Sequence, residues 1–175
     1  MILRRRRIWA QLLVAAALGG MVAGCGGYPQ ILNFPLGRGG KGLNSLAAEV
    51  SPHLSPPYLV FVSDRNGYQG IYLFNIQTRS LIALPGLNAL DEVVSQPSVS
   101  EDGRYIAFSL SRGGQTDIYL YDRQTQQKRN LTASLAAPTR NPSLSADGDR
   151  LAFEIARQGQ WDLQVMDRQG NLINP

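Results

Sequence analysis

Residues 97–109 read PSVSEDGRYIAFS, and residues 142–154 read PSLSADGDRLAFE, so one pattern returns after 45 residues. Each copy has a proline, an apolar residue and a serine, then an Asp-Gly pair and an apolar segment. The pairs are Asp102-Gly103 and Asp147-Gly148. Asp-Gly is a strong signal for a tight β-hairpin, because these residues tolerate a positive φ. The pattern therefore predicts a strand, a turn and a second strand in each copy.

A third copy begins at Ser51, with Pro52 standing 45 residues before Pro97. It has Pro56-Pro57 in place of Asp-Gly and is two residues shorter. Each copy continues with a further apolar segment, and the first two close with SLIAL at Ser80 and RNLT at Arg129. Four short strands in a period of about 40–45 residues are typical of a propeller blade. We therefore predict an all-β fold of three four-stranded blades, over approximately residues 51–95, 96–140 and 141–175.

The strand composition agrees with blades that are covered on both sides. In IYLYD, residues 118–122, both alternating faces are apolar, as expected for a strand buried between two neighbouring sheets. In the third copy Gln164 replaces the tyrosine of Tyr72 and Tyr119. This exchange predicts that one face of the last blade meets water or a wetter partner.

Residues 97–132 resemble the WD-like propeller repeat of TolB-type periplasmic proteins, down to its Leu-Thr close at Leu131-Thr132. Residues 142–168 match well and residues 51–84 more loosely. The motif specifies the repeat rather than a function, because propellers host many activities. TolB-like propellers are six-bladed, so the resemblance implies half a propeller with two uncovered end faces. A two-fold homodimer is our preferred way to cover them. The alternatives are an open wedge completed by another protein, and a gene remnant.

The N-terminal residues predict a lipoprotein signal peptide over 1–24. A positive segment of four arginines, Arg4 to Arg7, precedes the apolar run from Ile8 to Leu18. The sequence Val22-Ala23-Gly24-Cys25 resembles a bacterial lipobox, in which the cysteine is lipidated and the peptide bond before it is cut. Cys25 is the only cysteine, so no intramolecular disulfide is predicted. Residues 25–50, rich in Gly and Pro, are predicted to be a tether between a membrane anchor and the blades.

The charge distribution argues against nucleic-acid binding. The formal net charge is +4, and the four arginines of the signal peptide account for all of it. The remainder is formally neutral, so no basic patch is predicted that could neutralise a phosphate backbone.

The sequence offers little catalytic or metal-binding chemistry. His53 is the only histidine, and no Gly-x-Ser-x-Gly nucleophile elbow is present. One cysteine and one histidine nearly exclude a zinc site. Asp102, Asp147 and Asp149 could bind a hard cation, but turn formation explains them more simply. We therefore predict no catalytic residue, no metal and no cofactor.

Arginine recurs at one repeat position, four residues after the strand phenylalanine, as Arg65, Arg112 and Arg157. Three such side chains on one rim could form a binding site for an anion or an acidic peptide. Solvated loop charges are the simpler interpretation.

These features together predict a non-catalytic lipoprotein whose TolB-like blades form a protein-interaction or scaffold surface. Its predicted location is the periplasmic side of the cell envelope. Gly26 after the lipidated cysteine is similar to the residue at this position in outer-membrane-directed lipoproteins of some bacteria, and this resemblance favours the outer membrane. Two alternatives stay open: a subunit that completes another protein's propeller, and a small envelope hydrolase or lyase.

Overall fold

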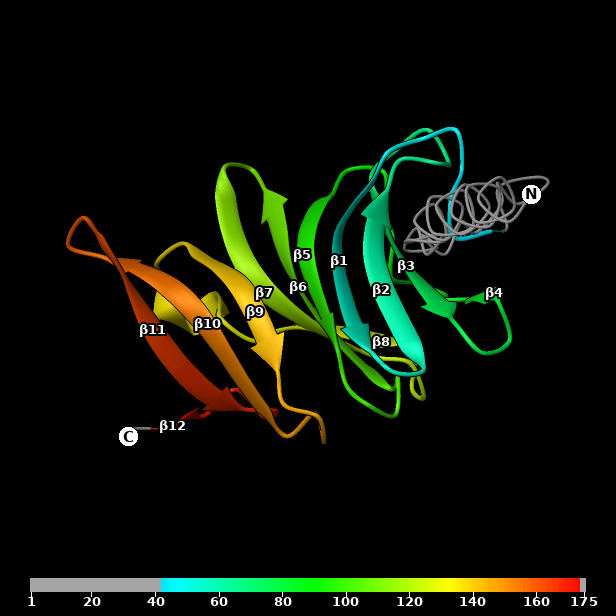
Figure 1. The fold of residues 1–175 in the computed structure, drawn as a ribbon. Coiled ribbons are helices and arrows are strands. Elements are labelled where there is room, and N and C mark those ends of the chain that lie inside the picture. Colours follow the sequence, from blue (N-terminus) through cyan, green and yellow to red (C-terminus); the bar gives the residue numbers. More distant parts are fainter. Residues whose placement is uncertain (1–41, 174–175) are drawn as a thin grey trace, which may run out of the picture. The chain divides into compact units, whose positions relative to one another are not determined.

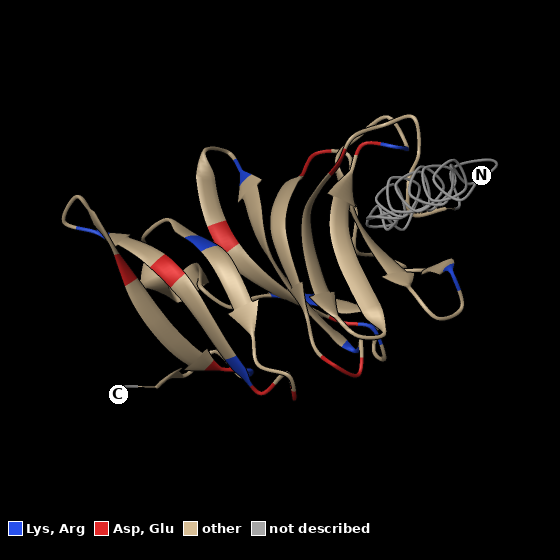
Figure 2. Cartoon of the chain, viewed as in Figure 1, with Lys and Arg blue, Asp and Glu red and all other residues tan. Residues whose placement is uncertain are grey.

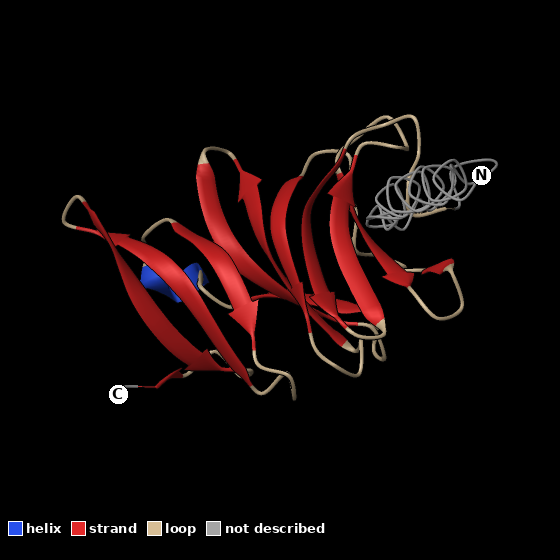
Figure 3. Ribbon diagram, viewed as in Figure 1, coloured by secondary structure: helices blue, strands red, loops and turns tan. Residues whose placement is uncertain are grey.

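The computed structural model of the chain describes residues 42–173. The predicted signal peptide, lipobox and Cys25 lie outside this range, as does most of the predicted tether. Within it, the strands form three four-stranded antiparallel sheets (Figures 1 and 3), and the helical structure is a single 3-10 turn, η3 (Ala133–Leu135). None of the described segments forms a helix long and apolar enough to cross a membrane. The predicted all-β fold of three four-stranded blades is confirmed.

Each sheet is a meander in which every strand pairs with the next strand in sequence. Blade 1 contains β1 (Glu49–Ser55), β2 (Tyr58–Ser63), β3 (Gly70–Asn75) and β4 (Ser80–Ile82). Blade 2 contains β5 (Val93–Val99), β6 (Tyr105–Arg112), β7 (Gln115–Asp122) and β8 (Gln127–Asn130). Blade 3 contains β9 (Thr139–Leu144), β10 (Arg150–Arg157), β11 (Gln160–Asp167) and β12 (Leu172–Ile173).

The apolar core lies between the blades, in two layers. β6 supplies both layers, because alternate residues of a strand point to opposite faces of the sheet. Ile106 and Phe108 pack toward blade 1, whereas Ala107 packs toward blade 3, and all three are fully buried. Blade 2 is therefore covered on both faces, as its all-apolar strands predicted.

The first strand of each blade makes the contacts that join the sheets. β5 contacts β1, β2 and β3 of blade 1 and also β9 of blade 3. The backbone N–H of Val99 donates to Nδ1 of His53 at 3.3 Å, and that of Leu144 donates to Oγ of Ser98 at 3.0 Å. The two donors are 45 residues apart in the sequence, and so are the two acceptors. Equivalent hydrogen bonds therefore join β5 to β1 and β9 to β5.

Each first strand also carries a β-bulge. Ser51, Gln96 and Asn141 have φ values of 51°, 52° and 53°, in the left-handed region. The strand pairing shifts register at each of these residues. A bulge bends a strand and increases its twist. In the second bulge, Oε1 of Gln96 accepts a hydrogen bond from the backbone N–H of Asn141 at 3.1 Å.

The Asp-Gly turns bring each blade against an aromatic ring of the preceding blade. A Cβ added to Gly103 would lie 2.6 Å from the Tyr58 ring, and one added to Gly148 would lie 2.6 Å from the Tyr105 ring. Both glycines have a positive φ, of 67° and 71°. Glycine is thus required here for two reasons, the backbone conformation and the close approach of the ring.

The Leu-Thr close of the repeat stabilises the third strand of its blade. Oγ1 of Thr132 accepts a hydrogen bond from the backbone N–H of Ile118 at 2.9 Å. In blade 1 the same bond, at 2.8 Å, runs from the N–H of Ile71 to Oδ1 of Asn88. In blade 1 the segment SLIAL at Ser80 contains β4. The residue that plays the part of Thr132 is Asn88, which follows this segment in the sequence.

The exchange of tyrosine for Gln164 predicted a face of blade 3 that meets water or a wetter partner, and the structure shows which face carries this residue. Gln164 pairs with Phe153 across β10 and β11, and Phe153 packs toward blade 2. The half-buried glutamine therefore lies on the covered face of blade 3, and the free face is the opposite one.

We predict that Gly148→Ala lowers the free energy of unfolding by about 2–4 kcal/mol, because strain at positive φ adds to overpacking against Tyr105. The matched control is Gly113→Ala, since Gly113 also has a positive φ, of 60°, but has no atom within 4 Å of the added Cβ. It should cost only about 1 kcal/mol. Urea unfolding followed by circular dichroism measures both values, and equal losses would show that the ring contact is unimportant.

We predict that stability falls on acidification through the pH range just below 6.5. Burial lowers the pKa of His53 from its ordinary value of 6.5, so the folded chain favours the neutral imidazole that accepts from Val99. The contribution of His53 is present above the pKa of the unfolded chain and is lost as the pH falls through the lower folded value. His53→Ser introduces the residue of the other two copies and should remove this part of the pH dependence. Urea midpoints at pH 7.5 and 5.5 provide the comparison, and an unchanged difference in the variant would contradict the assignment.

Candidate functional site

The three arginines at the shared repeat position have different environments. Arg65 lies against the face of blade 1 that is turned away from blade 2, with its guanidinium carbon 5.1 Å from the ring centroid of Phe61 and 4.8 Å from that of Tyr72. Its side chain is only 3% exposed and pairs with Glu49, at 2.9 Å between Nη2 and Oε1. Arg65 also donates to the backbone carbonyl oxygens of Gly42 and Leu43, both at 2.7 Å. It thus holds the segment before β1 against blade 1.

The other two arginines are exposed. Arg112 forms ion pairs with Asp91 at 3.1 Å and with Glu92 at 2.8 Å, and Glu92 also pairs with Lys128. Arg157 ends β10 and is exposed. Figure 2 shows Lys and Arg interspersed with Asp and Glu along the three blades. The structure therefore does not bring the three guanidinium groups together as one set of unpaired cations, and their role in binding stays a prediction.

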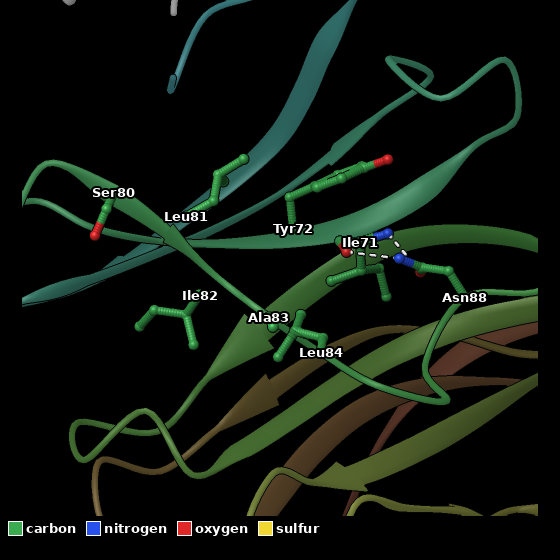
Figure 4. Close-up of a pocket in the computed structure, with 8 residues that line it drawn as sticks. All are labelled: Ile71, Tyr72, Ser80, Leu81, Ile82, Ala83, Leu84 and Asn88. Atoms are coloured by element: carbon green, nitrogen blue, oxygen red, sulfur yellow. Dashed lines mark hydrogen bonds between the residues drawn. The ribbon is translucent and has the colours of Figure 1, made fainter. Parts of the chain in front are cut away.

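A cavity of about 420 Å³ lies at the outer edge of blade 1 (Figure 4). It is lined by residues of β3, β4 and the following loop, namely Ile71, Tyr72, Ser80, Leu81, Ile82, Ala83, Leu84 and Asn88. The Asn88 side chain is already used, because it both accepts from and donates to the Ile71 backbone. Most of the described lining residues are apolar and none is a charged residue, so these walls suit an apolar group.

The hydroxyl of Tyr72 is buried and, among the described residues, has no hydrogen-bond partner. Burial is the main cause of the raised pKa of this phenol. A buried hydroxyl without a partner carries an energetic cost, and here it lies on the face of blade 1 that is turned away from blade 2.

A smaller polar cavity of about 180 Å³ lies between blades 2 and 3. Arg104 approaches Asp122 with two hydrogen bonds, of 3.0 and 2.8 Å, which hold the pKa of that carboxyl below its ordinary value. The guanidinium carbon of Arg168 lies 4.5 Å from the ring centroid of Tyr105. These charged side chains are paired or stacked with other residues of the chain. We therefore interpret the cavity as part of the junction between blades 2 and 3 and not as a ligand site.

The predicted turn residues lie where the blades meet. Asp102 and Asp147 each accept a hydrogen bond from the serine two residues earlier and from the backbone two residues later. Within residues 42–173 no three acidic, histidine or cysteine side chains gather as metal ligands. His53, the only histidine, is occupied by its bond to Val99.

The most unusual surface of the described chain is the free face of blade 3. Trp161 is 43% exposed, Leu163 81% and Val165 37%, and all three lie on β11. The guanidinium of Arg140 stacks on Trp161 at 3.8 Å and pairs with Glu154 at 2.6 Å. Asn141 also donates to Glu154, and these two neighbours hold the pKa of the carboxyl below its ordinary value. Such an exposed apolar face marks an interaction surface. The sequence analysis anticipated it only as an uncovered end of the repeat.

Comparison with known proteins gives this architecture a family. Residues 41–175 match the family described as the TolB beta propeller domain. The Tol-Pal system protein TolB of Francisella tularensis subsp. tularensis is 32% identical over 77 residues, which are 43% of this chain and 17% of that protein. The chain thus aligns with less than a fifth of that relative's length.

The fold is also found in solved structures. TolB of Acinetobacter baumannii superimposes with a TM-score of 0.60 and 25% identity, covering 74% of this chain and 32% of that one. A protein assigned as TolB in Agrobacterium tumefaciens gives 0.56 and 24%, covering 74% and 48%. The propeller domain of the trilobed protease of Pyrococcus furiosus gives 0.56 and 16%, covering 73% and 42%. These matches confirm the predicted resemblance, and the chain belongs to the TolB β-propeller domain family.

Proposed function

We propose that this chain is a lipid-anchored protein of the bacterial cell envelope whose blades bind other proteins. The observation that carries the proposal is the match of residues 41–175 to the TolB β-propeller domain, behind a sequence that resembles a lipoprotein signal. Lipidation of Cys25 and cleavage after Gly24 would attach the chain to a membrane. The relative in Francisella is named a Tol-Pal system protein, which supports a place on the periplasmic side.

The blades themselves support binding rather than catalysis. Histidine and cysteine occur once each in the chain, and His53 is engaged in a hydrogen bond between blades. None of the described residues that line the apolar cavity on blade 1 is a charged residue. A puromycin-hydrolysing peptidase of Mycobacterium tuberculosis has a similar fold, but at 18% identity this likeness concerns the fold alone. No arrangement of side chains in residues 42–173 favours the hydrolase or lyase alternative.

The rim arginines are a secondary candidate for contact with an acidic partner. Arg157 is the best placed of the three, because it is exposed at the end of β10, whereas Arg65 is buried in an ion pair. The free face of blade 3 offers more apolar surface than this rim, so we regard it as the main binding surface.

Anchoring is tested by Cys25→Ala in the full chain, produced in a bacterial host with lipoprotein processing. The native chain should incorporate labelled palmitate and sediment with membranes. The variant should lose the label and leave the membrane fraction, because two or more acyl chains are what make attachment lasting. Cys25→Ser provides a second variant that also lacks the thiol, and label retained by either would refute lipidation at this residue.

Binding is tested by chemical cross-linking of intact cells, followed by purification of the anchored chain. Cross-linked products that contain a defined second polypeptide should appear with the native chain. The appearance of only uncross-linked chain would contradict the interaction role, whatever the outcome at Cys25.

A further inference from the structure

The outer face of blade 1, which is turned away from blade 2, carries Phe61, Tyr72 and Phe74. Phe61 pairs with Tyr72 across β2 and β3, and Phe74 lies on the same face, since alternate residues of a strand point the same way. Ile71 and Leu73 alternate with them and pack toward blade 2. Phe61 and Phe74 are only 2% and 1% exposed, and the Tyr72 hydroxyl is buried. Among the described residues no further sheet lies on this face, so its burial has to come from chain outside the sheets.

Arg65 holds the chain that precedes β1 on this outer face. Its guanidinium lies over the two stacked rings and donates to the backbone carbonyl oxygens of Gly42 and Leu43, both at 2.7 Å. Arg65 also makes further interactions. Closer to β1, the backbone N–H of Ala48 donates to Oδ1 of Asp64 at 3.0 Å. The backbone is thus fixed at the outer face from Gly42 onward, and the residues before Gly42 start from that place.

In blade 2 the equivalent rings are covered by a blade. Phe108 and Tyr119 stack at 6.0 Å between centroids, on the face that meets blade 1. Arg112, at the repeat position of Arg65, does not cover these rings and pairs instead with Glu92. The chain before β1 therefore occupies, at blade 1, the place that a neighbouring blade occupies at blade 2. Terminal repeats of such arrays need a cap of this kind to stay soluble.

The sequence supplies apolar side chains for a cap shortly before Gly42. Residues 37–41 read GRGGK and offer none. Phe34 and Leu36 are the nearest large apolar residues before them, with Pro35 in between. A residue before proline favours an extended backbone, in which positions two apart point to the same side. Phe34 and Leu36 can therefore face one surface together.

The apolar cavity of about 420 Å³ adjoins the outer face of blade 1. Tyr72 belongs to both, and Leu81 lines the cavity as well (Figure 4). A cavity of this size is in the range that holds small ligands, so it can receive large apolar side chains. Gly42 is bonded to Arg65, whose guanidinium carbon lies 4.8 Å from the centroid of the Tyr72 ring. Because residues 37–41 can span up to about 16–18 Å, the apolar pair before them can reach the cavity.

We infer that Phe34 and Leu36 pack against the outer face of blade 1, in the cavity beside Tyr72, and that residues 34–48 cap this end of the array. Three observations select this segment as the occupant. The outer face is buried, the backbone is fixed on it at Gly42, and the first large apolar residues before Gly42 lie within reach. With blade 1 capped, the exposed apolar face of the described blades is that of blade 3.

The cap shortens the predicted tether. With Phe34 docked, a lipidated Cys25 would be joined to the blades by residues 26–33 alone. A link of this length spans at most about 26–29 Å, so the blades would stay close to the membrane. This consequence rests on the proposed lipidation of Cys25, whereas the cap itself does not.

The first experiment measures urea unfolding of the full chain in detergent by circular dichroism. Phe34→Ala should lower the unfolding midpoint by about 1 M, from the free energy of burying a phenylalanine and the urea dependence typical of small proteins. Leu46→Ala is the matched control, since Leu46 belongs to the same cap but is 98% exposed, and it should leave the midpoint unchanged. Phe34→Ala combined with Leu81→Ala should lower the midpoint by less than the sum of the single effects, because residues in contact are not independent.

The second experiment locates the segment by thiol chemistry, in chains that all carry Cys25→Ser. Under native conditions a maleimide should label Leu36→Cys about tenfold or more slowly than Leu46→Cys, because docking protects the thiol. The two rates should become equal in urea. A short bismaleimide should link Leu36→Cys to Leu81→Cys within one chain. It should not link Leu36→Cys to Leu163→Cys, since Leu163 lies on the free face of blade 3.

The inference is overturned by an unchanged midpoint of Phe34→Ala, by equal labelling of Leu36→Cys and Leu46→Cys in the native state, or by links that form only between two chains. The last result would indicate that the segment of a second copy occupies the outer face. Because the labelled chains lack the thiol of Cys25, this test is separate from the palmitate test. A native chain that incorporates palmitate would leave the proposed anchoring intact even if the cap failed.

Discussion

The contact between neighbouring blades is the interaction on which the described structure depends. A four-stranded sheet with apolar side chains on both faces gains little from folding alone, because both faces remain in water. Blade 2 is covered on both sides, and its residues Phe108 and Ile118 are fully buried in the two layers. Stability in such an array is close to a sum of terms for each repeat and each junction. Loss of one junction therefore affects more than the residues that form it.

The junction combines two kinds of contact with different tasks. The apolar layer supplies most of the free energy, but many alignments of two flat apolar faces would bury a similar area. The hydrogen bonds from Val99 to His53 and from Leu144 to Ser98 are satisfied in one register only. The glycine turns restrict the approach further, because the Tyr105 ring fits only against a residue without a Cβ. The alignment of neighbouring blades is thus restricted by polar and steric contacts in addition to the apolar layer.

Much of the fold could be predicted because its determinants are local. The Asp-Gly pairs, the proline spacing and the doubly apolar strands each act through the residues that carry them, so their period is visible in the sequence. The bulges were not predicted, because Ser51, Gln96 and Asn141 are three different residues that share one conformation. Sequence spacing finds a repeated residue type, whereas a repeated backbone conformation can be occupied by several types. The equivalence of Asn88 with Thr132 was missed for the same reason: both supply an oxygen to the same backbone N–H.

The site was less predictable than the fold, because it depends on which neighbour each position has. Arg65, Arg112 and Arg157 occupy one repeat position but have different environments. Arg65 is buried against two aromatic rings, Arg112 is paired with acidic residues, and Arg157 is exposed. Repetition predicts equal environments only for blades with equal neighbours, and within residues 42–173 only blade 2 has a blade on each side.

The two ends of the described array differ, and this difference connects the fold to binding. At blade 1, Arg65 and Glu49 lie against the face that is turned away from blade 2, and Phe61 and Phe74 on this face are only 2% and 1% exposed. At blade 3, Leu163 and Val165 remain 81% and 37% exposed. A surface that was only an accidental end would not need the side chains of a junction. Because blade 3 retains apolar groups at the positions of Ile118 and Leu120, together with Ser143 at the position of Ser98, its outer surface has the composition of the surface by which blade 2 contacts blade 3.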